Sequence, residues 1–81
     1  MNGWKNYETW NVALWIGNDT SLYDAAQNCN DYAQFVGMLE EFGDSSEREP
    51  FNVYGTPDGV NWQNPHLDVD ALDAMIREIK K

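Results

Sequence analysis

The sequence predicts a mainly α-helical protein, a small single domain of three or four helices in which a short β-hairpin can precede the last helix. Three observations support this fold class. Four segments carry apolar residues at helical spacing, each follows a residue that caps helices well, and turn chemistry (Pro-Asp-Gly) precedes the fourth segment. A chain of 81 residues is expected to form one domain, residues 1–81, around one core.

The first predicted helix covers residues 7–16, between the capping residue Asn6 and Gly17. On a helical wheel its aromatic residues and Leu14 occupy one arc, and its aliphatic residues occupy the opposite arc. A helix with so few polar residues around its circumference is typically central and surrounded by its neighbours. Asn11 has two interpretations: an amide that is hydrogen-bonded in the interior, which we favour, or the point where this helix meets water.

The next two helices are shorter and follow each other closely. A second helix is expected at residues 21–29, with Asp19 or Thr20 as its cap. The third covers residues 32–42 and stops at Gly43. The two segments form either separate helices or one kinked helix.

Two further elements are expected in the second half of the chain. The residues that alternate with polar neighbours around the turn Thr-Pro-Asp-Gly, and so suggest a hairpin, are Phe51, Val53, Val60 and Trp62. The last helix starts behind the cap Asp68. Its predicted buried face consists of Val69, Leu72, Met75, Ile76 and Ile79.

The charge composition argues against direct binding to phosphates. The chain has 14 acidic and 5 basic residues, a net charge of −9. Between residues 6 and 76 there are 13 acids against Arg48 alone, a difference of −12. Without a cluster of Lys and Arg, direct binding to nucleic acid or to an anionic membrane is not expected. The acidity either serves solubility or matches a partner with a basic surface.

The cysteine count and the hydropathy suggest a cytoplasmic protein. Cys29 is the only cysteine, so neither an internal disulfide nor a thiolate metal cluster is expected. The start of the sequence lacks the pattern of a signal peptide, and no apolar run reaches the roughly 18 residues of a membrane span.

The groups that could carry chemistry are few, so we expect no enzyme, no metal and no cofactor. His66, in a loop before a helix start, is typical of a surface or packing residue, and Cys29 on an apolar stripe is typical of a small buried residue. Asp68, Asp70 and Asp73 could present oxygens together. The sequence nevertheless has neither a calcium-binding loop nor paired histidines around them.

An acidic segment is the first candidate for binding a partner. Its carboxylates are Glu40, Glu41, Asp44, Glu47 and Glu49, which surround Arg48. Acidic residues at the C-terminal, negative end of a helix dipole oppose stability, which suggests another reason for their presence. The alternative is a solvated helix end.

The second candidate is a surplus of aromatic residues in loops or at helix margins. These residues are Trp4, Tyr23, Tyr54 and Trp62, and aromatic side chains are enriched in interface hot spots. Tyr54 and Trp62 are the two that we include with the acidic segment in the predicted partner-binding set. Burial in the core is the alternative explanation.

Two separated motifs resemble a family of small proteins that bacteriophages, mobile elements and some bacteria carry. They are NYETWNVALWIGND followed by SLY, and TPDGVNWQNPHLDVDALDAMI. The resemblance covers both ends of the chain and not residues 29–54. It implies a context of small accessory proteins, without an activity and without functional residues.

The charge and this context together predict a non-enzymatic acidic binding protein in the cytoplasm of a host cell. Its expected target is a host or defence protein that handles nucleic acid, as for inhibitors of the anti-CRISPR or antirestriction type, bound through the acidic surface. The alternative is a structural or assembly module that uses aromatic residues in a homodimer or heteromer interface.

Overall fold

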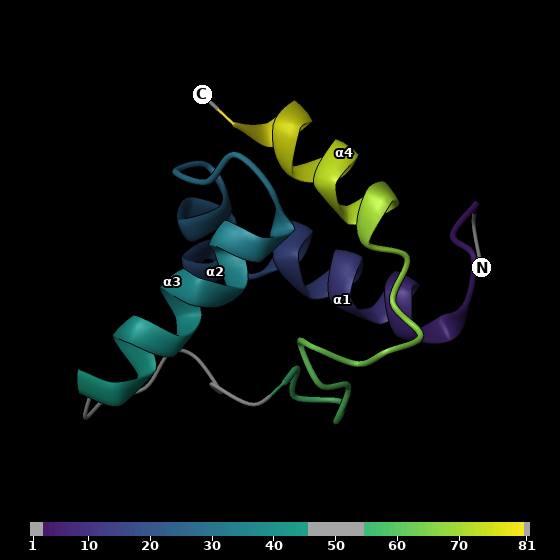
Figure 1. Ribbon diagram of the computed structural model, residues 1–81, viewed down its shortest axis with the longest axis horizontal. Coiled ribbons are helices and arrows are strands. Elements are labelled where there is room, and N and C mark those ends of the chain that lie inside the picture. The colour runs from purple at the N-terminus through teal and green to yellow at the C-terminus, as the bar shows by residue number, and fades with distance from the viewer. Residues whose placement is uncertain (1–2, 46–54, 81) are drawn as a thin grey trace.

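The computed structural model describes residues 3–45 and 55–80, with side chains as far as residue 41 in the first range. The helices of these ranges are α1 (Tyr7–Asn18), α2 (Thr20–Ala26), α3 (Tyr32–Ser45) and α4 (Val69–Ile79). Helices α1 and α4 begin at the same end of the molecule, and α3 leads away from them (Figure 1). The mainly α-helical fold class is therefore confirmed.

Side-chain oxygens cap the helix starts, as the sequence predicts. Asn6, Asp19 and Asp68 each accept a hydrogen bond from the backbone amide three residues ahead, at 2.9, 3.1 and 3.3 Å. Asp31 does the same before α3, at 2.9 Å. Each bond satisfies an amide that has no partner inside its own helix, which fixes where the helix begins.

The predicted ends of α1 and α3 are wrong, because both helices continue past their glycines. Helix α1 includes Gly17 and α3 includes Gly43. The amide of Asp19 still bonds to the Trp15 carbonyl at 3.0 Å, so the last turn of α1 closes beyond the glycine. Glycine permits a left-handed cap without requiring one, and here its backbone stays helical.

Helices α2 and α3 are separate, and α2 ends at Ala26 rather than at residue 29. The amides of Asn28 and Cys29 bond to carbonyls only three residues back, each at 3.1 Å. This tighter pattern ends an α-helix and turns the chain toward the cap of α3.

The core is a single cluster to which every helix contributes. Its residues with no exposed surface are Val12, Ile16, Ala26, Cys29, Phe35, Leu39, Leu72 and Ile76. Trp62, from the segment before α4, is 2% exposed and meets the Phe35 ring edge-on at a centroid distance of 5.8 Å. On the predicted buried face of α4, Leu72 and Ile76 are buried, Met75 and Ile79 are partly buried against the core, and Val69 is 45% exposed.

Helix α1 is not surrounded on all sides, which corrects the prediction of a central helix. Its aliphatic arc is buried, whereas Tyr7 is 44% and Leu14 is 37% exposed. The aromatic arc therefore lies at the surface, where the Tyr7 and Trp10 rings contact each other at a centroid distance of 5.7 Å. Four short helices do not provide enough neighbours to cover the whole circumference of one of them.

The Pro-Asp-Gly turn is present, with one antiparallel bridge between Gly55 and Asn61. The Thr56 amide bonds to the Val60 carbonyl at 2.8 Å, and Gly59 takes the positive φ of 93° that the turn needs. Phe51 and Val53, which would extend the predicted hairpin, lie outside the described residues.

Candidate functional site

Hydrogen bonds join the start of α1 to the start of α4. The Thr9 hydroxyl donates to Asn6 Oδ1 at 2.6 Å and accepts from the Asp68 amide at 2.9 Å. Asn6 also donates through Nδ2 to the His66 carbonyl, at 2.7 Å. Thr9 is fully buried and its two bonds are partly buried, whereas the bond from Asn6 to His66 is exposed. Together these bonds hold the starts of α1 and α4 next to each other.

A second hydrogen-bond network joins the Pro-Asp-Gly turn to α1 through Asn11. Asn11 is buried and hydrogen-bonded, which is the interpretation that we favoured. Asn11 is 1% exposed, accepts from the Thr56 hydroxyl at 2.7 Å and donates to Asp58 Oδ2 at 2.8 Å. The Trp15 indole N–H donates to the same Asp58 oxygen at 2.9 Å. Asp58 thus receives two donors from one helix, which lowers the pKa of its carboxyl below the ordinary value.

The Asp58 network predicts a loss of stability in acid. Because the folded-state pKa of Asp58 lies below the unfolded one, its contribution is complete above about pH 3.9 and is lost as the pH falls through the folded-state value. We expect Asp58→Asn to be less stable than wild type at pH 7, with the difference shrinking toward pH 2. Urea unfolding of both proteins across this range measures it. A difference that stays constant with pH would contradict the assignment.

Much of the acidity serves the fold. Asp19, Asp31 and Asp68 cap their own helices, and Asp73 of α4 accepts from the Tyr32 amide at the start of α3, at 2.8 Å. With Asp58, five aspartates therefore hold structural positions. The total of 14 acidic residues therefore overstates the number of carboxylates that are available to a partner.

The predicted acidic segment is only partly described. Glu40 and Glu41 are exposed on α3, and the helix continues over Asp44, whose side chain is not described. Glu47 and Glu49 lie outside the described residues, as does Tyr54. The C-terminal end of a helix dipole is negative and disfavours carboxylates. The last turn of α3 carries no basic residue that could offset this effect.

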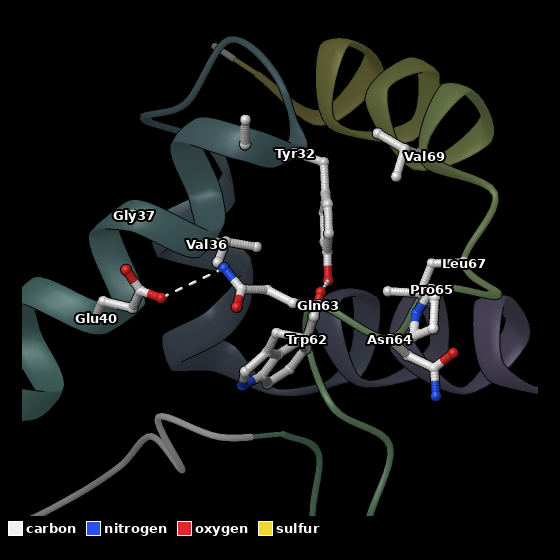
Figure 2. A pocket seen from close by; sticks show the side chains of 11 residues that line it. Tyr32, Val36, Gly37, Glu40, Trp62, Gln63, Asn64, Pro65, Leu67 and Val69 are labelled. Carbon is white, nitrogen blue, oxygen red and sulfur yellow. Dashed lines mark hydrogen bonds between the residues drawn. The ribbon is translucent and has the colours of Figure 1, made fainter.

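A cavity of about 460 Å³ lies beside Glu40. Figure 2 shows Glu40 and Val36 of α3 on one side, Leu67 and Val69 on the other, and Trp62 and Gln63 between them. The Gln63 amide donates to Glu40 Oε2 across the cavity at 3.4 Å, a long contact that leaves most of the carboxylate free. The volume is within the range of ligand pockets.

Of the aromatic residues predicted to contact a partner, Trp62 is buried and the other two described ones are half-buried. Trp62 is 2% exposed and packs in the core, the alternative that the sequence left open, although it also lines the cavity. Trp4 is half-buried against the core, and Tyr23 is half-buried at α2. Among the aromatic residues whose side chains the structure describes, Tyr7 is the most exposed, and it lies in the helix that we had expected to be central.

Three of the groups with potential chemistry, Cys29, Asp68 and Asp73, have structural partners, whereas His66 and Asp70 are exposed. The Cys29 thiol is fully buried, donates to the Ala25 carbonyl at 3.2 Å, and has a pKa raised by burial and by the charge of Asp31. Such a thiol is disfavoured as a nucleophile. Asp68 and Asp73 accept backbone amides, and no group of three potential metal ligands occurs within residues 3–45 and 55–80. No helix in these ranges is long and apolar enough to cross a membrane.

Sequence reasoning missed the cavity because its walls come from distant segments. Gly37 was the available signal: it provides no side chain one turn before Glu40, and a Cβ placed there would meet nothing within 4 Å. An uncovered glycine in a helix leaves space beside the neighbouring side chains.

The fold and this surface define a small acidic helical domain with a cavity beside an exposed carboxylate. The chain belongs to a protein family described as a family of unknown function, DUF7249, whose model matches residues 1–81. No curated protein and no solved structure matches the chain significantly.

Proposed function

We propose that the protein is a non-enzymatic acidic binding protein that inhibits a nucleic-acid-handling protein of its host or of a defence system. The observation that carries this proposal is the exposed pair Glu40 and Glu41 on α3, beside a cavity and without a compensating base in the last helical turn. Carboxylates on a helical frame can compete for Lys and Arg side chains that otherwise contact phosphates.

The context for this target is the resemblance to small phage-type proteins, and the supporting chemistry is the charge. Five aspartates are committed to the fold, yet the glutamates of α3 have no such role apart from the long Gln63 contact. Exposed charge of one sign steers a partner of the opposite sign, and the steering weakens as salt screens it. We also propose that the protein is cytoplasmic and does not bind nucleic acid directly.

The test compares two variants with equal loss of charge. Glu40→Gln with Glu41→Gln removes the α3 pair, and Asp24→Asn with Glu78→Gln removes two other exposed acids. We expect the first variant to bind the captured partner about tenfold more weakly than the second, with a smaller salt dependence. Equal affinity of the two variants would show that the α3 surface is not the binding site.

The exposed aromatic arc of α1 favours a second candidate function, an assembly module. Tyr7 and Leu14 are 44% and 37% exposed, next to the half-buried Trp10. Light scattering over a range of concentrations would show a mass above 9.3 kDa if this arc forms a homodimer, and Tyr7→Ser with Leu14→Ser would restore the monomer. A monomer at all concentrations would remove the homodimer form of this candidate.

A further inference from the structure

The cavity beside Glu40 combines apolar walls with one negative charge. Val36, Trp62 and Leu67 are at most 9% exposed and form its inner surface. Val69, which is 45% exposed, stands at its edge. Glu40 is the one charged residue among the described residues that line it. An occupant should therefore be apolar along most of its length and positively charged at one end.

The Glu40 carboxylate has unused hydrogen-bond acceptor capacity for a positively charged group. Its one hydrogen bond among the described residues is the 3.4 Å contact with the Gln63 amide, so nearly all its acceptor capacity is unused. The acids Glu41, Asp31, Asp68 and Asp70 lie next in sequence to lining residues and add negative potential. Lys and Arg are absent from the lining residues.

We propose that this cavity takes an arginine side chain of the partner, with the guanidinium on Glu40 and the apolar stem along Val36, Leu67 and Val69. Arginine fits because its guanidinium makes two parallel hydrogen bonds to a carboxylate and is less strongly hydrated than an ammonium group. Its methylene stem is apolar and packs well on apolar surface. The inference rests on the proposed function, since it names the group that an acidic inhibitor would capture.

Two variants separate the charge of the cavity from its space. Glu40→Gln removes the carboxylate and keeps the shape, and its control is Glu41→Gln, which removes an equal charge from the neighbouring exposed position that does not line the cavity. Gly37→Leu fills space without changing charge, because a Cβ at Gly37 meets nothing within 4 Å. All three positions are exposed on α3, so the variants should fold, which thermal unfolding verifies.

The probe is N-acetyl-arginine methylamide, with the uncharged citrulline analogue as its control, titrated into labelled protein and followed by NMR. We expect arginine-specific shifts at the Gln63 side-chain amide and at the Val36 and Val69 methyl groups. Binding should weaken about fivefold or more in Glu40→Gln and in Gly37→Leu, and by less than about twofold in Glu41→Gln, whose charge acts on the cavity only from a distance.

Several outcomes would overturn the inference. Equal weakening by Glu40→Gln and Glu41→Gln would leave a diffuse acidic surface, so the proposed function would survive without the arginine cavity. Equal shifts with the citrulline analogue would indicate a neutral occupant. Shifts at these residues that depend on protein concentration without any probe would indicate a second copy of the chain. No shifts with arginine would also overturn it, while partner capture tests the proposed function separately.

Discussion

Trp62→Ala is expected to lower the free energy of unfolding by about 3–5 kcal/mol, the range for removing a large aromatic side chain from a core. Trp62 is 2% exposed, and its ring meets Phe35 edge-on at a centroid distance of 5.8 Å. The hydrogen bond from the Tyr32 hydroxyl, at 2.5 Å, goes to the Trp62 carbonyl and remains possible in the variant. The Tyr32 bond therefore does not account for the expected loss.

Urea unfolding at neutral pH checks this value, with Tyr7→Ala as the control. Tyr7 is also a large aromatic residue but is 44% exposed, so its truncation should cost less than about 1 kcal/mol. If Trp62→Ala were no more destabilising than Tyr7→Ala, Trp62 would not be a core residue. The prediction that Trp62 belongs to a partner-binding surface would then gain support.

Gly55→Ala is expected to cost about 2–3 kcal/mol through steric conflict rather than through lost packing. A Cβ at Gly55 would lie 2.4 Å from the Val60 carbonyl oxygen and 2.9 Å from the carbonyl carbon. Both atoms belong to the backbone, so the turn itself must move. The same Val60 oxygen accepts from the Thr56 amide at 2.8 Å, and Thr56 in turn bonds to the buried Asn11.

Gly37→Ala provides a control of opposite sign. Gly37 lies inside α3 with open space around it, so alanine should stabilise the helix by about 0.5–1 kcal/mol. Chemical unfolding of both variants gives the comparison. A neutral or stabilising Gly55→Ala would mean that the close approach between the two sides of the turn does not exist.

The sequence predicted the elements that depend on local chemistry. Caps at Asn6, Asp19 and Asp68 are decided by a side chain and an amide three residues away, so they can be recognised without tertiary structure. The predicted helix ends at Gly17 and Gly43 were wrong because a glycine does not by itself end a helix. Glycine tolerates several conformations, and the surroundings decide whether a helix continues past Gly17 or Gly43.

Features that join distant segments could not be predicted in the same way. Asn11 was expected to have an interior partner, but its partners Thr56 and Asp58 lie more than 40 residues away in the chain. The wheel of the first helix separated an aromatic from an aliphatic arc, and only the packing of the other helices decides which arc is covered. The cavity beside Glu40 likewise exists because α3 meets the segment before α4.

These long-range bonds give the two motif segments a structural explanation. Asn6, Thr9 and Asn11 from the first segment bond to Thr56, Asp58, His66 and Asp68 in the second. The residues that carry the resemblance therefore include those that hold the fold together. The proposed binding surface on α3 lies between these segments in the sequence.

The most direct test of the acidic-surface proposal is the salt dependence of partner capture. Tagged protein would be incubated with host lysate at about 0.1 M and about 1 M salt, where the Debye length falls from about 10 Å to about 3 Å, and bound proteins identified by mass spectrometry. We expect a nucleic-acid-handling protein that is captured at low salt and lost at high salt. We also expect that neutralising Glu40, Glu41, Asp44, Glu47 and Glu49 abolishes the capture. A partner that remains bound at high salt, or capture of this chain alone, would contradict the account and favour the aromatic arc of α1.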